Sequence, residues 1–221
     1  MKYYPIFLRV AGRPCLVIGG GKVAERKAES LLKAGAVVTV ISPELTPPLA
    51  AWAAAHRVTH HSRRYTTGDL RGCFVAYAAT NDTALHGLIA RDARAAGVLL
   101  NVADCPELCD FIAPAVLDHG DLIIATSTSG ASPALAKRIR RDLEEMLGPE
   151  YGLALELLRR LRERLTQQAW PAAERQRVFA ALVDSSLLEH LRRQQTGAVD
   201  QLLETTVGAG CSLASLGMST S

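Results

Sequence analysis

The chain has 221 residues, of which 48% are apolar and 21% charged, and its formal net charge is +3. This length suffices for one large domain or two modest ones. A net charge this small does not by itself indicate a nucleic-acid partner, and the Arg-rich segments near the C-terminus are interspersed with glutamates, as on a solvated helix face. We expect no nucleic-acid partner.

The cysteines and the apolar runs bear on the compartment. The five cysteines are odd in number, and two of them lie in strand-like apolar runs, so no disulfide framework is expected. The N-terminus does not fit a signal peptide, and no apolar run approaches the ~18 residues that a membrane helix requires. We therefore expect a cytoplasmic protein with no membrane partner.

Strand-like and helix-like segments alternate through the first half of the chain. Ile6, Leu8 and Val10 alternate before Gly12, which predicts a hairpin over 6–18 that ends in a buried strand. Strands connected by crossover helices imply a parallel sheet covered on both faces, a doubly wound α/β fold of Rossmann type. Further strands are predicted at 37–41, 58–62, 74–79 and 99–102, and helices at 23–34, 49–56 and 83–96.

The pattern changes after residue 113. A strand-like run at 122–125 precedes a small polar stretch, and a helix is predicted at 133–147. Helical stripes with a break near Pro171 follow, and the chain ends in a Gly/Ser-rich stretch. The predicted divisions are a Rossmann domain at 1–113, a small α/β dimerisation segment at 114–147, a helical domain at 148–207 and a disordered tail at 208–221.

A glycine loop lies between the first buried strand and the first helix. Residues 17–24, Val-Ile-Gly-Gly-Gly-Lys-Val-Ala, fit the pattern G-x-G-x-x-A. Gly19 permits the tight turn, Gly21 lets a pyrophosphate approach the backbone, and the helix start at Lys22 and Val23 offers free N–H groups and a positive dipole end. In a βαβ unit this pattern predicts a dinucleotide site. The alternative is a tight structural turn without a nucleotide.

Two further segments are predicted to complete the dinucleotide site. The usual acidic residue at the end of the second strand is absent, and Ser42-Pro43-Glu44 stands there, so Glu44 is a candidate for the ribose hydroxyls. No arginine is adjacent to receive a 2′-phosphate, which favours NAD over NADP. Thr80 and Asn81 follow the fourth strand, where the ligand crevice of such a sheet lies.

A carboxylate follows the fifth strand. Asn101 and Asp104 lie at its carboxyl end, where they can contact a substrate, and Asp104 can accept a proton. The alternative for Asp104 is a turn former before Pro106. Cys105 and Cys109 have no second pair at suitable spacing, so we expect free thiols and no metal site.

A hydroxyl-rich loop precedes the helix predicted at 133–147. Ser132 is suited to cap that helix and Pro133 to be its first residue. The alternative to a ligand site is an ordinary capped, solvated helix. Hydroxyls, free N–H groups and a nearby cation nevertheless make an anion-friendly site, whose candidate substrate-binding residues are Ser127, Thr128, Ser129, Ser132 and Lys137.

Taken together, these segments resemble the precorrin-2 dehydrogenase and sirohydrochlorin ferrochelatase family, the N-terminal module of siroheme synthase. The matching blocks run in family order over roughly residues 1–145 and are Pro5–Phe7, Val17–Lys27, Ala78–Asp82, Asn101–Asp104, Phe111–Ala115 and Ser129–Ala136.

The resemblance implies an oxidoreductase that uses NAD to convert precorrin-2 to sirohydrochlorin, an activity often followed by insertion of ferrous iron, a lyase reaction, to give siroheme. It implies that Asp104 takes part in the chemistry as a base or metal-handling group. It also implies a homodimer in which residues 114–147 are exchanged between subunits. The methyltransferase domain of some siroheme synthases is expected to be absent.

Two other functions are alternatives to this one. An NAD(H)-sensing regulatory module without catalysis would explain the glycine loop and the sheet, but not the block around Asp104 or the Ser132-Pro133 segment. A short-chain dehydrogenase would need a tyrosine with a lysine four residues later, and no tyrosine of this chain has one.

Overall fold

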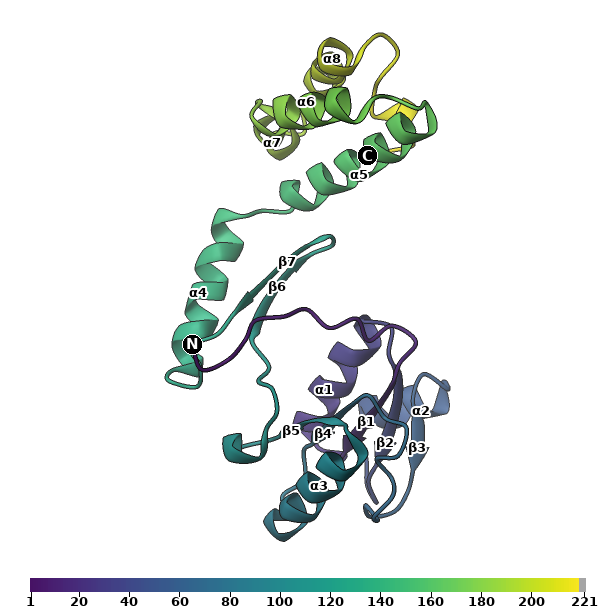
Figure 1. The fold of residues 1–221 in the computed structure, drawn as a ribbon, viewed down its shortest axis with the longest axis vertical. Helices are drawn as coiled ribbons and strands as arrows, with labels where there is room; N and C mark the ends of the chain where they lie inside the picture. The colour runs from purple at the N-terminus through teal and green to yellow at the C-terminus, as the bar shows by residue number, and fades with distance from the viewer. Residues whose placement is uncertain (219–221) are drawn as a thin grey trace. The chain divides into compact units, whose positions relative to one another are not determined.

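The structure is a computed structural model that describes residues 1–218. The chain divides into two compact units, the first spanning Met1–Ala113 and the second beginning at Pro114. Figure 1 shows the elements of each unit, which are described separately below.

The first unit is a five-stranded parallel sheet with the strand order β3-β2-β1-β4-β5. After β3 the chain returns to pair β4 with the other edge of β1, which creates a switch point between β1 and β4. The Rossmann-type α/β prediction is therefore confirmed. The strands are β1 (Pro14–Ile18), β2 (Val37–Ile41), β3 (Thr59–His61), β4 (Val75–Ala78) and β5 (Leu99–Val102), and the helices are α1 (Lys22–Lys33), α2 (Pro47–Ala54), α3 (Thr83–Ala96) and the short η1 (Pro106–Leu108).

Both faces of the sheet are buried, as a parallel sheet requires. Leu16 packs on one face with Ile89 of α3, and Val17 packs on the other with Leu49 of α2. The predicted helix at 83–96 is confirmed at both ends: Asp82 accepts a hydrogen bond from the Leu85 N–H at 3.2 Å, and Gly97 ends it in the left-handed conformation.

The predicted N-terminal hairpin is wrong. No strand precedes β1, and Ile6 and Phe7 are 61% and 73% exposed. The physical reason lies in the sheet: β1 pairs with β2 along one edge and with β4 along the other, so neither edge is free for a hairpin partner.

The second unit combines a hairpin with helices. β6 (Ala115–His119), which was not predicted, pairs antiparallel with β7 (Leu122–Thr126). Leu157, Leu161 and Leu165 form a buried stripe that packs against the later helices. The helices are α4 (Pro133–Met146), α5 (Glu150–Gln167), α6 (Ala172–Val183), α7 (Leu187–Arg192), α8 (Thr196–Val207) and the short η2 (Ala214–Leu216).

The C-terminal segment is ordered through residue 218, so the prediction of a disordered tail is wrong for residues 208–218. Leu213 and Leu216 are buried in the helical core. The Arg160 guanidinium donates to the carbonyl oxygen of Leu216 at 3.1 Å and to that of Gly217 at 2.8 Å. Apolar burial and satisfied carbonyls outweigh the Gly/Ser composition here. Residues 219–221, also part of the predicted tail, lie outside the described residues.

Candidate active site

The three glycines between β1 and α1 have different surroundings. Gly19 has φ +120°, and a Cβ there would overlap the Ala79 carbonyl oxygen. A Cβ on Gly20 would overlap the Glu44 carbonyl oxygen and lie 2.7 Å from the Ser42 Oγ. A Cβ on Gly21 would meet nothing within 4 Å. The first two glycines are therefore required by packing, whereas Gly21 faces open space.

The start of α1 is uncapped. Gly21 is its N-cap residue, with extended backbone and no side-chain capping bond. The N–H groups of a first helical turn have no partner within the helix, and the helix dipole is positive there. This end of α1 is therefore suited to an anionic group, as the glycine-loop prediction requires.

A cavity of about 390 Å³ opens at the carboxyl edge of the sheet beside the glycine loop. We call it the glycine-loop cavity. It lies at the switch point between β1 and β4, where open α/β sheets bind their ligands. Gly19, Gly21, Pro43, Thr80 and Asn81 line it as predicted residues, and Gly20 and Ser42 join them.

Three predicted cofactor residues are not among those that line this cavity. Lys22 and Val23 are the first two residues of α1, so their backbone N–H groups belong to the uncapped start of that helix. Glu44 is exposed, and its carbonyl accepts a hydrogen bond from the Ser42 hydroxyl at 2.7 Å. Glu44 therefore contributes its backbone to the turn after β2, and it is not among the residues that line the cavity.

An arginine lies close to the end of β2 in the glycine-loop cavity. Arg64 lines the cavity together with Ser42 and Pro43. No arginine is adjacent to Glu44 in the sequence, but one from a more distant segment lines the same cavity. Arg64 comes from the segment after β3, which pairs with β2, so the proximity arises from the sheet and not from adjacency in sequence.

The loop after β4 is held by a histidine that sequence reasoning missed. His86, on α3, is 6% exposed, and its Nε2 lies 3.0 Å from the Thr80 carbonyl oxygen. The Asp82 N–H donates to the Thr80 Oγ1 at 3.1 Å. These bonds fix the backbone that presents Thr80 and Asn81 to the cavity. A His placed one turn into a capped helix is a weak signal in sequence.

Asp104 lies just beyond β5 on the same edge of the sheet. Its side chain is exposed and its φ is +59°, in the left-handed region. The preceding Ala103 N–H donates to the Ala78 carbonyl oxygen at 2.8 Å, which ties this rim to β4. Asp is one of the residues that adopt this conformation most readily, and His56, Ser129, Ala169 and Gln194 adopt it as well. The conformation therefore fits the turn-former alternative, and a catalytic role for Asp104 stays a prediction.

Asn101 has a structural task. Its Nδ2 donates to the Phe111 carbonyl oxygen at 2.9 Å, which anchors the segment after η1 to β5. Because the Nδ2 is used in this bond, only the side-chain oxygen of Asn101 is left for the predicted contact with a substrate.

The two cysteines beside Asp104 are held as thiols. Hydrogen bonding to the Glu107 carboxylate raises the pKa of Cys105 to about 11, and burial raises the pKa of Cys109. A metal ligand must be a thiolate. Within residues 1–218, no group of three His, Cys, Asp or Glu side chains could hold a metal ion.

The hydroxyl-rich loop belongs to the second unit and joins β7 to α4. Ser132 caps α4 by accepting from the Leu135 N–H at 3.2 Å. The Thr128 hydroxyl donates to the Ser132 carbonyl oxygen at 3.0 Å and accepts from the Ser132 N–H at 3.1 Å. The Ser127 Oγ also accepts from the Ser129 N–H at 3.0 Å, so three hydroxyls maintain the loop. Ligand contact by this loop and by the exposed Lys137 stays a prediction.

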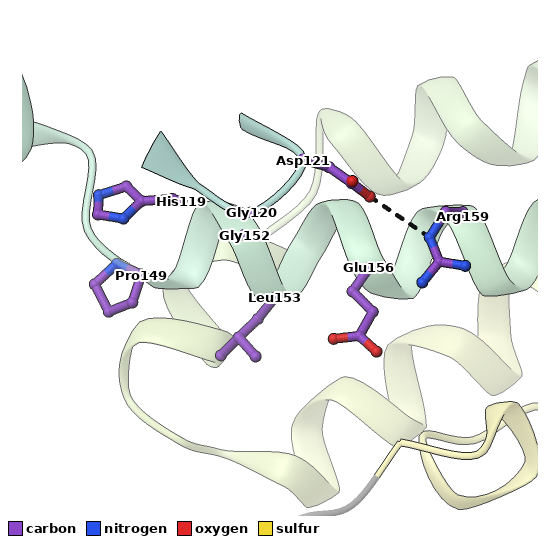
Figure 2. Close-up of a pocket in the computed structure, with 8 residues that line it drawn as sticks. All are labelled: His119, Gly120, Asp121, Pro149, Gly152, Leu153, Glu156 and Arg159. Atoms are coloured by element: carbon purple, nitrogen blue, oxygen red, sulfur yellow. Dashed lines mark ion pairs between the residues drawn. The ribbon is translucent and has the colours of Figure 1, made fainter. Parts of the chain in front are cut away.

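A second cavity, of about 450 Å³, lies within the second unit between the β6–β7 turn and α5 (Figure 2). Gly152 allows the close approach, because a Cβ there would lie 2.6 Å from the His119 carbonyl oxygen. Asp121 and Arg159 pair across the cavity at 3.5 Å, as the dashed line in Figure 2 marks. The His119 Nε2 lies 2.8 Å from the Leu147 carbonyl oxygen. Asp121, Arg159 and His119 therefore all have polar partners. The cavity was not predicted from the sequence.

Comparison with known proteins agrees with this architecture. A family model described as putative NAD(P)-binding matches residues 6–115, and one described as sirohaem biosynthesis protein central matches residues 120–146. The solved structure of "SirC, precorrin-2 dehydrogenase" superimposes with a TM-score of 0.75 at 26% identity, covering 92% of this chain and 98% of that chain. No helix in the described part of the chain has the length and apolar character needed to cross a membrane.

Curated relatives are siroheme synthases. That of Nitrosococcus oceani is 37% identical over 95% of this chain and 45% of its own length. That of Ectopseudomonas mendocina is 41% identical over 81% of this chain and 38% of its own length. The chain thus spans about half or less of the length of these relatives. The resemblance predicted from the motifs is confirmed, and the chain belongs to the family of siroheme synthases and precorrin-2 dehydrogenases.

Proposed function

We propose that this chain catalyses the NAD-dependent dehydrogenation of precorrin-2 to sirohydrochlorin. The observation that carries the proposal is the open space over Gly21 at the uncapped start of α1, in a cavity on the sheet edge that also bears Asp104. An uncapped helix start with room above it suits a pyrophosphate, and an exposed carboxylate on the same rim suits a proton acceptor.

The residues of the glycine-loop cavity fit a dinucleotide. Backbone N–H groups of Gly21, Lys22 and Val23 hold the pyrophosphate, and the absence of any obstacle above Gly21 lets it approach. Ser42 and Pro43, which line the cavity at the end of β2, would contact the adenosine ribose, and Thr80 and Asn81, which follow β4, would contact the nicotinamide end. When bound, the nicotinamide supplies a hydride acceptor.

Asp104 takes the proton that accompanies the hydride. Dehydrogenation of precorrin-2 removes one hydride and one proton, so a base must act opposite the hydride acceptor. Asp104 is exposed on the rim of the sheet, so its carboxylate is accessible to the macrocycle. The side-chain oxygen of Asn101, which belongs to β5, accepts a hydrogen bond from a pyrrole N–H in this proposal.

The substrate carries several carboxylates, which need cationic and hydroxyl partners. Ser127, Ser129 and Lys137 have these groups, and the first turn of α4 adds N–H groups. Thr128 and Ser132 hold this loop in shape through the bonds described above.

The active form is proposed to be a homodimer that pairs through residues 114–147. One face of the β6–β7 hairpin is exposed and carries Val116 and Ile123, which are 45% and 46% exposed. Apolar side chains gathered on one strand face favour burial against another surface, and a second copy of the chain is the commonest such partner.

The proposal is tested by anaerobic incubation of the purified chain with precorrin-2 and NAD. Sirohydrochlorin and NADH should accumulate together. Binding of NAD(H) without turnover would instead indicate an NAD(H)-sensing regulatory module. Addition of ferrous iron to the completed reaction then tests iron insertion, the second activity that the family resemblance implies, through the appearance of siroheme.

A further inference from the structure

The adenosine end of the glycine-loop cavity lacks the acidic side chain that normally faces the ribose. In NAD-selective Rossmann sites, an Asp or Glu at the end of the second strand binds the 2′-hydroxyl, and it repels a 2′-phosphate. Here Ser42 and Pro43 line the cavity at that place and the Glu44 side chain does not. The feature that excludes a 2′-phosphate is therefore missing.

Arg64 fills the same corner with a positive charge. It lines the cavity and is exposed, and among residues 1–218 it forms no ion pair with an acidic side chain. A free guanidinium beside the ribose position can donate paired hydrogen bonds to a phosphate.

The segment that carries Arg64 is anchored on both sides. The preceding Arg63 donates two hydrogen bonds to Asp69, at 2.7 and 2.8 Å. The following Tyr65 is 7% exposed, and its hydroxyl donates to Asp92 at 2.9 Å. Arg64 thus projects from backbone that is fixed before a ligand arrives, which reduces the entropy lost on binding.

The turn after β2 is tied to the same segment. The Ser62 hydroxyl donates to the Pro43 carbonyl oxygen at 3.3 Å, and the His60 Nε2 lies 2.9 Å from the Ser42 carbonyl oxygen. These two bonds hold the ribose-facing turn and the base of Arg64 together as one wall of the cavity.

We propose that Arg64 receives a 2′-phosphate, so that this cavity binds NADP as well as NAD and Arg64 sets the ratio of the two affinities. The inference rests on the proposed function, because it takes the glycine-loop cavity to be the coenzyme site. It extends that function from one coenzyme to two.

The test compares binding of NAD⁺ and NADP⁺ to the full chain by isothermal titration calorimetry, with 2′,5′-ADP as a probe of the adenosine end alone. Arg64→Gln should weaken NADP⁺ and 2′,5′-ADP by about tenfold, the effect of losing one charge-assisted contact, and should change NAD⁺ less than twofold. Arg64→Lys should restore part of the loss. Added salt should weaken NADP⁺ more than NAD⁺.

Arg71→Gln is the matched control, since Arg71 is an exposed arginine a few residues later that does not line the cavity. It should leave all three affinities unchanged. Wild-type protein that binds NAD⁺ but not NADP⁺ overturns the inference and leaves the proposed function standing. An equal loss of both coenzymes in Arg64→Gln, or no loss of either, also overturns it. Protein that binds neither coenzyme overturns the proposed function itself.

Discussion

Two neighbouring glycines give a sharp test of how the loop after β1 works. In the sequence Gly20 and Gly21 are equivalent members of a triplet, but the structure gives them opposite surroundings. A Cβ on Gly20 would overlap backbone of Glu44, whereas one on Gly21 would enter empty space. We therefore expect Gly20→Ala to damage the fold and Gly21→Ala to damage coenzyme binding.

The magnitudes follow from those surroundings. Overpacking costs about 1–3 kcal/mol, and Gly20→Ala should lie at about 3 kcal/mol because its obstacle is backbone and cannot rotate away. At about 4–8 °C per kcal/mol, this lowers the Tm of the first unit by about 12 °C or more. Gly21 has φ −84° and ψ −173°, which alanine adopts freely, so Gly21→Ala should change stability by less than about 1 kcal/mol.

The same methyl group on Gly21 stands where the pyrophosphate approaches. Loss of one hydrogen bond to a charged group, about 1.5–3 kcal/mol, weakens binding by about 10- to 150-fold. Thermal unfolding followed by circular dichroism measures the first effect, and NADH fluorescence titration the second. Wild-type affinity in Gly21→Ala, or wild-type Tm in Gly20→Ala, would refute the reasoning.

Four other variants or conditions test separate parts of the account. Asp104→Asn should bind NAD normally but lose about 10²- to 10⁴-fold in kcat, measured as NADH formation, because it cannot accept the proton; full activity would remove Asp104 from the mechanism. Burial by itself raises the pKa of Glu150, but the hydrogen bonds and charge of Arg192, together with backbone hydrogen bonds, lower that pKa below its ordinary value of 4.5. The Glu150–Arg192 pair therefore stabilises the second unit above about pH 4.5, and this stabilisation is lost as the pH falls through the lowered pKa. Urea unfolding at several pH values should show the loss. The Arg192→Gln variant should be less stable than the wild type at pH 7 and should lack this part of the pH dependence. Ile123→Lys, on the exposed hairpin face, should convert a dimer into a monomer in light scattering, and an unchanged dimer would place the interface elsewhere. Truncation after residue 207 should lower the free energy of unfolding of the second unit by about 3–5 kcal/mol, because it removes buried leucines worth about 1.5–3 kcal/mol each, and a truncated chain of unchanged stability would contradict the packing described for the tail.

Local signals were predicted well because their causes lie within a few residues. The helix at 83–96 has its cap at Asp82 and its glycine at Gly97, and the structure places both ends there. The strand at 99–102 is likewise confirmed. Gly120-Asp121, a two-residue turn between the runs 115–119 and 122–126, is the local signal in the sequence for β6 and its hairpin.

Features that depend on distant neighbours could not be predicted in the same way. The hairpin over 6–18 has suitable alternation, but β1 is occupied on both edges by strands that come later in the chain. Arg64 reaches the end of β2 only because β3 pairs with β2. The requirement for Gly20 arises from the Glu44 carbonyl, which the chain brings back only after α1 and β2. Tertiary placement, and not residue type, decides each of these.

The central claim is that a dinucleotide held at the glycine loop is the oxidant of precorrin-2. The most direct measurement is an anaerobic single turnover in which NADH and sirohydrochlorin are quantified together, in wild-type protein and in Gly21→Ala. The account predicts one NADH for each sirohydrochlorin in the wild type and a strongly reduced yield of both in the variant at the same limiting NAD concentration. Sirohydrochlorin formed without NADH, or equal yields from the two proteins, would contradict it.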